Sequence, residues 1–395
     1  MLLSQKKQKI NPDQTDDGKL PGNDNNPGQK PRPEGRKARI LVAPLDWGLG
    51  HATRCIPVIR ELLAQNVEVW LASEGSQEKL LRLEFPDLPF LQLTGYRVKY
   101  AATAMGLAWK MLAQSPRLTR AIKAENLWLK KKVEEYRFDA VISDNRFGLY
   151  HPSVPCIFIT HQLIIKTPFG KWSEKIIQKR NYRYINRFSQ CWVPDLPGNN
   201  NLAGDLSHPE KKPDIPLYYI GILSRFAKLP LHEKKGHLLI TLSGPEPQRS
   251  LLENIILRDI IKYEGTATIV RGLPGDATLL PSTNQIRIYN HLAADRLNEE
   301  MQSAELVISR SGYSTAMDLA TMQKKSILIP TPGQTEQEYL AKYFIQKEFA
   351  SCALQEYFSL PAEVEKARLF PCHWPPVDST GLLKQQIHNL LKEIL

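Results

Sequence analysis

Residues 305–344 read ELVISRSGYSTAMDLATMQKKSILIPTPGQTEQEYLAKYF, and their pattern decides the class of fold. The apolar run at 306–308 ends in SRSG at 309–312, and residues 313–322 then place apolar side chains at helical spacing. A second apolar run at 326–329 is followed by a polar turn and another helical pattern. This order predicts strand, glycine turn, helix, strand, turn and helix, which is typical of a parallel α/β sheet.

The polar residues of this stretch indicate a sugar-nucleotide pocket. Both predicted strands end in small polar residues at a helix start, where free backbone N–H groups and the helix dipole favour an anion. Asp318 lies one turn into the first helix, in reach of a ribose, and Gln337 and Glu338 open the second helix. Alternatively, Asp318 is a solvated helix acid and Glu338 forms an ion pair with Lys342.

Composition places the chain among soluble globular proteins. Its 395 residues are enough for two or three domains. The content of 42% hydrophobic and 24% charged residues is ordinary for a globular protein. No apolar run approaches the roughly 20 residues that span a bilayer, and the start is too short for a signal peptide, so we expect a cytoplasmic protein. Five cysteines without a CxxC pair indicate buried free thiols in a reducing compartment. The net charge of +11 implies an anionic partner, for which a nucleotide, an acidic membrane surface and nucleic acid all qualify.

Alternating strand and helix patterns divide the chain into two similar α/β halves with a cleft between them, each a doubly wound parallel sheet. A polar tail at 1–37 buries too little surface to order itself. The halves are predicted at 38–222 and 223–380, and the first contains a long helical region, 105–136, interrupted at Ser115-Pro116. A final helix, 381–395, has one apolar face that we expect to pack back on the first half.

The loop GLGH at 48–51 follows the first predicted strand. It matches the start of a dinucleotide fingerprint, but Thr53 occupies the third glycine position, so we expect no NAD or FAD site. Its glycines make a tight turn, and His51 at the mouth of the helix would point into the cleft, near neutral and able to accept a proton. A histidine that only packs is an equally open reading.

Two further turns could bind a diphosphate. Ser243-Gly244 and Ser311-Gly312 each end a strand before a helix, and each could donate backbone N–H groups to a phosphate. Ordinary turn chemistry explains either one alone. Two such loops in one domain, together with Asp318, favour the phosphate site.

Several kinds of site are not expected. No Asp-x-Asp pair, Cys/His cluster or GxxxxGK[ST] loop occurs, so we expect neither a metal ion nor another cofactor. Residues 166–187 are basic and aromatic, with the single acid Glu174, which fits a nucleic-acid surface, a membrane-facing surface or a solvated helix face. Because no RNA-recognition or zinc-finger signature accompanies this segment, nucleic acid is the least favoured partner.

The stretch 309–344 resembles the donor-binding region of MurG-type glycosyltransferases, with a family 28 C-terminal domain, and GLGHATR at 48–54 resembles their N-terminal loop. The resemblance covers roughly residues 38–395. It implies the GT-B architecture of two Rossmann-like domains facing across a cleft. It also implies acceptor binding in the first domain, nucleotide-sugar binding in the second and no required metal.

The resemblance also implies roles for individual residues. His51 matches the candidate general base, and Asp318 the acid that holds the ribose. By this resemblance the diphosphate would contact Ser243, Gly244, Arg225, Ser311 and Gly312, and the sugar would contact Gln337 and Glu338. The nucleotide base would contact the backbone around 289–292, including His291. The acceptor-side loop would contain Gly48, Gly50 and Arg54.

The chain departs from this family in three places. Asp46 and Trp47 replace glycines of the first loop, Pro245 and Pro247 remove two N–H donors, and Asp318 is one methylene shorter than the usual glutamate.

The sequence thus predicts an inverting transferase of a UDP-sugar. Its expected acceptor is a glycan, a lipid-linked molecule or a small molecule. The protein is expected in the cytoplasm, with peripheral contact to the anionic inner face of the membrane. Gly-x-Gly-His-x-x-Arg-Cys at 48–55 also resembles nucleotide-sugar hydrolases of nonulosonate biosynthesis, in which water replaces the acceptor. A non-catalytic nucleotide or nucleic-acid binder is the third alternative.

Overall fold

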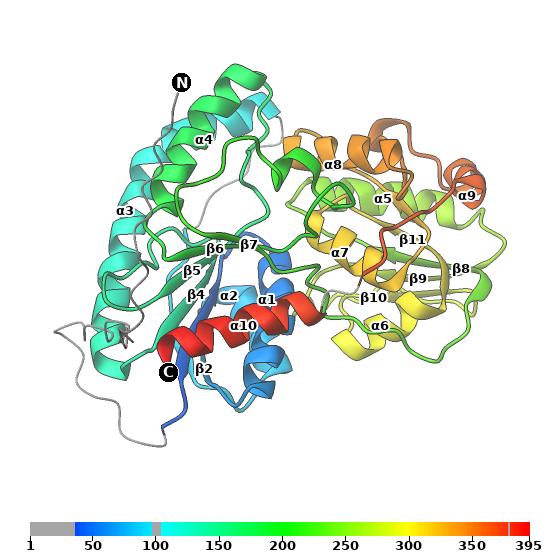
Figure 1. Cartoon of the computed structure of the whole chain (residues 1–395). Helices are drawn as coiled ribbons and strands as arrows, with labels where there is room; N and C mark the ends of the chain where they lie inside the picture. The colour runs from blue at the N-terminus through cyan, green and yellow to red at the C-terminus, as the bar shows by residue number, and fades with distance from the viewer. Residues whose placement is uncertain (1–35, 97–103, 378–379) are drawn as a thin grey trace, which may run out of the picture. The chain divides into compact units, whose positions relative to one another are not determined.

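The computed structural model describes residues 36–96, 104–377 and 380–395. Their strands form two sheets in which every pairing is parallel (Figure 1). The predicted tail, residues 1–37, lies outside the described residues except for its last two positions. No described helix is both long enough and apolar enough to cross a membrane.

The first sheet has seven strands in the order β3-β2-β1-β4-β5-β6-β7. The chain adds strands outward on one side of β1 and then crosses back to add β4 on the other side, so the winding direction changes between β1 and β4. The strands are β1 (Arg39–Pro44), β2 (Glu68–Ser73), β3 (Phe90–Gln92), β4 (Ala140–Asp144), β5 (Cys156–Ile159), β6 (Gln190–Val193) and β7 (Leu217–Tyr219). The helices of this half are α1 (Leu49–Ala64), α2 (Gly75–Glu84), α3 (Ala104–Tyr136) and α4 (Lys171–Ile185), with a 3₁₀ turn at Gly204–Leu206.

The second sheet repeats this winding in the order β10-β9-β8-β11-β12-β13. Its strands are β8 (Lys234–Thr241), β9 (Thr266–Val270), β10 (Ile286–Tyr289), β11 (Ala304–Ser309), β12 (Ser326–Leu328) and β13 (Ser351–Cys352). The remaining helices are α5 (Gln248–Ile260), α6 (Ala294–Ser303), α7 (Tyr313–Met322), α8 (Thr335–Gln346), α9 (Leu360–Leu369) and α10 (Thr380–Ile394), with a 3₁₀ turn at Gln355–Tyr357. The prediction of two doubly wound Rossmann-like sheets is confirmed.

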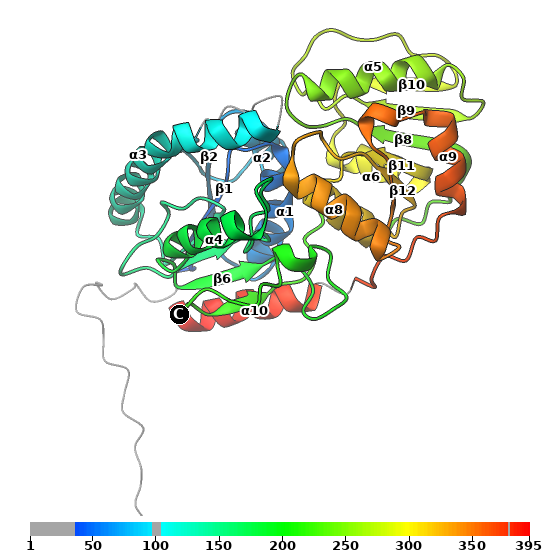
Figure 2. The same cartoon turned by 90° about the horizontal axis from the view of Figure 1, so that it is seen from above.

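Helices cover both faces of each sheet, which explains why the strands read as continuous apolar runs. In the first sheet, Ile40 and Val42 pack toward α1 and α2, whereas Leu41 and Ala43 pack toward α3 and α4. In the second sheet, α5 and α9 cover one face, and α6, α7 and α8 cover the other (Figure 2). Alternate residues of a strand therefore enter different layers of the core.

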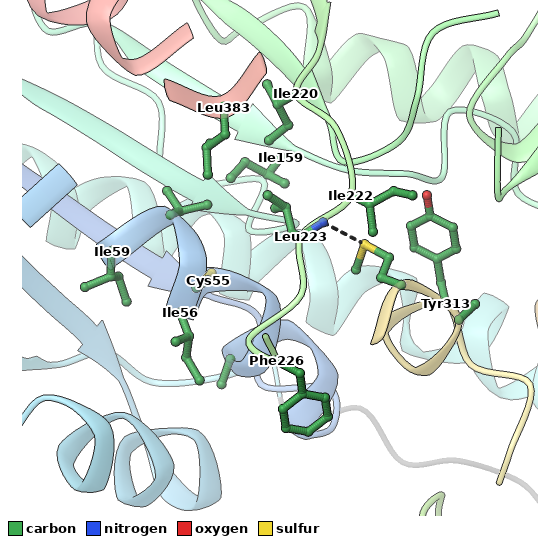
Figure 3. Packing of buried hydrophobic residues seen from close by; sticks show 14 of the residues in the cluster. Cys55, Ile56, Ile59, Ile159, Ile220, Ile222, Leu223, Phe226, Tyr313 and Leu383 are labelled. Atoms are coloured by element: carbon green, nitrogen blue, oxygen red, sulfur yellow. Dashed lines mark hydrogen bonds between the residues drawn. The ribbon is translucent and has the colours of Figure 1, made fainter. Parts of the chain in front are cut away.

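One apolar cluster contains residues of both sheets. The connection around Ile222 and Leu223 packs against α1 on one side and α7 on the other (Figure 3), and the backbone N–H of Leu223 donates to Met317 Sδ at 3.4 Å. The last helix, α10, contributes Leu383 and Ile387 to the same cluster. Gln65 also donates to the carbonyl of Lys384, which ties α1 to α10 at 3.1 Å.

The structure differs from the sequence prediction in its edge elements and in one long helix. Strands β3 and β13 were not predicted, and the two residues of β13 are too few to show a period. Helix α9 was not predicted either. Helix α3 continues through Ser115-Pro116 where an interruption was predicted. One interior proline costs about 3 kcal/mol, and a helix of 33 residues has many other hydrogen bonds to offset that cost.

Candidate functional site

The sequence-predicted residues of the first half lie where the winding of the sheet changes direction. Gly48 lies in the loop after β1 and Gly50 in the first turn of α1. Asp144 is the last residue of β4, the strand that pairs with β1. In the second sheet, Ser243-Gly244 follows β8 and Ser311-Gly312 follows β11, which are again paired strands. The carboxyl ends at such a change of direction are where doubly wound sheets bind ligands.

His51 lies in the first turn of α1, after Gly48, whose φ of 81° places it in the left-handed region that glycine adopts readily. His51 Nδ1 is 3.1 Å from Asp144 Oδ1, and the histidine side chain is 15% exposed. Within the described residues its Nε2 atom has no hydrogen-bond partner. Burial and the Arg54 charge lower the pKa of His51 below its usual value, although Asp144 opposes them. The ring is therefore neutral at neutral pH.

Arg54 and Asp144 fix the tautomer of His51. Arg54 donates from Nε to Asp144 Oδ2 at 2.6 Å and from Nη2 to Oδ1, the oxygen that His51 Nδ1 also faces. Arg54 Nη2 and His51 Nδ1 lie 2.9 Å apart because both donate to the same acceptor, Asp144 Oδ1. Burial alone would raise the pKa of Asp144, but Arg54 and His51 outweigh it and hold that pKa well below its usual range. The ionised Asp144 accepts a hydrogen bond from Nδ1–H, so the lone pair of Nε2 is available to accept a proton.

The polar network continues across to the second half of the chain. His161, after β5, accepts from Arg54 at 3.0 Å through Nδ1, and its Nε2 donates to Glu336 Oε1 at 2.9 Å. The His161 ring stacks on Tyr313 of α7 with centroids 4.1 Å apart. Burial by itself raises the pKa of Glu336, but His161 outweighs it and lowers that pKa. The candidate base is thus linked to the first turn of α8.

Sequence reasoning missed Asp144, His161 and Glu336. Two of them had a usable signal, since Asp144 ends a predicted strand and His161 ends another, and parallel strands carry both to one edge of the sheet. Glu336 directly precedes the predicted pair Gln337 and Glu338. No pattern in the sequence indicated that His161 contacts Glu336, or that Arg54 joins Asp144 to His161.

Asp318, Arg225 and His291 are brought together beside α7. Ser224 Oγ donates to Asp318 Oδ1 at 2.7 Å, and burial raises the pKa of Asp318 to about 6 despite the Arg225 charge. Burial lowers the pKa of Arg225, and burial together with Arg225 lowers the pKa of His291. A carboxylate held in an unfavourable environment is typical of functional sites.

The remaining predicted residues surround the starts of α7 and α8. Ser311 Oγ donates to the carbonyl of Gln337 at 2.9 Å, and Gly312 immediately precedes α7. The side chains of Gln337 and Glu338 accept from the backbone N–H groups of Thr331 and Gly333, so in this structure both brace the loop before α8. Ser243 and Gly244 are exposed.

The first turn of α1 directly contacts the first turn of α7. Ser314 Oγ donates to the carbonyl of Gly50 at 3.0 Å. A Cβ atom on Gly50 would lie 2.9 Å from Ser314 Oγ, so a side chain at this position would force Ser314 to shift. His51 and the free N–H groups at the start of α7 therefore lie on adjoining segments.

Comparisons with known proteins agree with this architecture. Residues 279–377 match the glycosyltransferase family 28 C-terminal domain. The chain is 22% identical over 324 residues to an uncharacterized glycosyltransferase of Methanosarcina acetivorans, covering 76% of this chain and 81% of the relative.

Two further proteins are similar over most of their length. The UDP-N-acetylglucosamine–N-acetylmuramyl-(pentapeptide) pyrophosphoryl-undecaprenol N-acetylglucosamine transferase of Glaesserella parasuis is 22% identical over 332 residues, covering 80% of this chain and 85% of that protein. The crystal structure of the glycotransferase of kitacinnamycin superposes with a TM-score of 0.61 at 15% identity, covering 91% of this chain and 96% of that one. At that identity the superposition shows a shared fold.

Proposed function

We propose that this glycosyltransferase, whose second half contains the family 28 C-terminal domain, transfers a sugar from a UDP-sugar to an acceptor hydroxyl group with inversion and without a metal ion. The observation that carries the proposal is the neutral His51, oriented by Asp144 and lying beside the start of α7. A base on one side and anion-binding N–H groups on the other match the two charges that develop during transfer.

The proposed reaction is a single displacement. His51 Nε2 accepts the proton of the acceptor hydroxyl as its oxygen forms a bond to the anomeric carbon. The bond from that carbon to the diphosphate breaks, and its electrons leave with UDP. The backbone N–H groups of Ser311 and Gly312 and the dipole of α7 stabilise the departing diphosphate. Asp318 accepts hydrogen bonds from the ribose hydroxyls, beside Arg225 and His291.

The test uses UDP, GDP, CDP and dTDP sugar conjugates, with nucleotide release and the anomeric configuration of the product followed by NMR. His51→Ala should abolish turnover and leave UDP affinity nearly unchanged, because His51 contacts the acceptor and not the nucleotide. His373→Ala is the matched control, since that histidine is 71% exposed and outside the network. An unchanged turnover rate for His51→Ala would rule out His51 as the general base. Rapid nucleotide release without an acceptor would favour the hydrolase instead. Binding without turnover of any conjugate would favour a non-catalytic binder.

The proposal includes a cytoplasmic protein with peripheral contact to an anionic membrane through α4. Phe169, Trp172 and Ile176 are spaced three and four residues apart, and they are 56%, 75% and 52% exposed. Exposed cations accompany them, namely Lys171, Lys175, Lys179, Arg180, Arg183 and Arg187. The acid of this helix, Glu174, lies 3.7 Å from Lys166. Apolar groups beside cations are the combination that binds anionic lipid surfaces.

Vesicles test this contact directly. The protein should co-sediment with vesicles containing phosphatidylglycerol and not with pure phosphatidylcholine, and binding should weaken at high salt. The double variant Trp172→Ser and Ile176→Ser should lose most of this binding. Leu369→Ser, which removes an 88% exposed side chain on α9, is the control that keeps it. Equal binding by the double variant would exclude α4 as the contact.

A further inference from the structure

Among the residues that the structure describes, Arg310 is a buried cation without a carboxylate partner. It follows β11 in the SRSG turn and is 1% exposed. Burial lowers the pKa of its guanidinium to about 10, which still leaves it charged at neutral pH. Isolated charges in a protein interior are costly, so they are normally paired.

The other deeply buried arginines of the described residues follow that rule. Arg54 pairs with Asp144, Arg146 with Glu125, and Arg249 and Arg271 both pair with Glu253. Within the same residues, Arg310 donates only to backbone carbonyls. These are the carbonyl of Gln248 at 2.7 Å and those of Ile329 and Pro330, both at 3.4 Å.

Two unsatisfied polar atoms lie near Gly244. Arg310 Nε and Thr331 Oγ1 are both buried, and neither has a hydrogen-bond partner in the described part of the chain. Both face Gly244, because a Cβ atom built on that glycine would lie 3.6 Å from Thr331 Oγ1 and 4.0 Å from Arg310 Nε. Gly244 itself is exposed and has a φ of 104°, which a residue with a side chain rarely adopts.

The three residues come from the ends of three neighbouring strands. Gly244 follows β8, Arg310 follows β11 and Thr331 follows β12, and these strands are consecutive in the second sheet. A small anion seated over Gly244 would place an oxygen near a buried charge and two unused donors. Charge-assisted hydrogen bonds of this kind are among the strong ones in proteins.

We propose that Arg310 and Thr331 form an anion subsite beside Gly244 that binds a phosphate group of the nucleoside diphosphate. This inference rests on the proposed function, and it names a cation that the sequence did not single out. A fixed positive charge there would also stabilise the negative charge on the departing diphosphate. Pro245 and Pro247 remove two backbone donors from this loop, and a buried guanidinium compensates for their loss.

The experiment measures the affinities of uridine, UDP and inorganic pyrophosphate by calorimetry, on the full chain and three variants. The variants are Arg310→Met, Arg310→Lys and Thr331→Val. We expect Arg310→Met to weaken UDP and pyrophosphate about tenfold or more and to leave uridine unchanged, since a hydrogen bond to a charged group is lost. Arg310→Lys should weaken them less, and Thr331→Val about fivefold. Arg258→Met, on the exposed side of α5, is the control with native affinities.

The outcomes separate this inference from the proposed function. If the native chain does not bind UDP, both the proposed function and the proposed phosphate subsite are refuted. If the native chain binds UDP and the variants weaken UDP and uridine equally, Arg310 only braces the loops and the subsite is overturned. Unchanged affinities in all three variants would overturn it as well. Should Arg310→Met not fold, the ratio of UDP to uridine affinity in Arg310→Lys and Thr331→Val decides.

Discussion

Replacing Asp318 by asparagine should make the protein more stable at neutral pH. Burial raises the pKa of this carboxyl from 3.8 to about 6. That shift of about 2 pKa units means that the ionised form costs about 3 kcal/mol in the folded state. Asparagine imitates the protonated acid, and its side-chain oxygen can still accept from Ser224 Oγ. Asp318→Asn should therefore raise the free energy of unfolding by about 3 kcal/mol at pH 7.5.

The stability difference between the two proteins should depend on pH. A carboxyl whose folded pKa is raised binds more protons in the folded than in the unfolded state between about pH 4 and pH 6. The native protein loses stability as pH rises through this window, whereas the variant does not. The advantage of Asp318→Asn should thus fall to about half at pH 5 and vanish below about pH 4.

Urea unfolding of both proteins at pH 7.5 and pH 5 measures the difference, and other titrating groups cancel because both proteins contain them. The same variant should bind UDP about five- to tenfold more weakly, because a neutral acceptor replaces a charged one at the ribose. A variant that is less stable than the native protein at pH 7.5, or a difference that does not change with pH, would refute the reasoning.

Three further predictions concern the first half and the loop after β9. Asp144→Asn should lower the free energy of unfolding by about 3–5 kcal/mol in urea, because it leaves the buried Arg54 unpaired; native stability would mean that Arg54 has another adequate acceptor. On the acidic side of the pH profile, the midpoint for loss of turnover should lie below pH 6.5, because the pKa of His51 is lowered and the base is lost only as pH falls through that pKa. A midpoint above pH 6.5 would contradict this. Gly272→Ala should cost more than about 1 kcal/mol by thermal unfolding, since its φ is 70° and a Cβ atom would clash with the carbonyl oxygen of Leu242; an unchanged midpoint would count against the strain.

The local pattern of the sequence was enough to predict the architecture. Apolar runs such as those within 39–45 and at 306–308 are strands covered on both faces, and the glycine turns after them lead into helices. These signals are local, because backbone periodicity depends only on neighbouring residues. Edge strands such as β13 escaped prediction, since two residues show no period.

Only the tertiary structure decided how the polar residues meet. The sequence predicted His51 as the base, but its partner Asp144 is 93 residues away and His161 and Glu336 extend the contact to the second half. The same holds for Arg310, which reads as one more polar residue in a turn. Whether a charge is paired depends on which strands lie side by side and on what covers them, and that is settled by sheet order and packing.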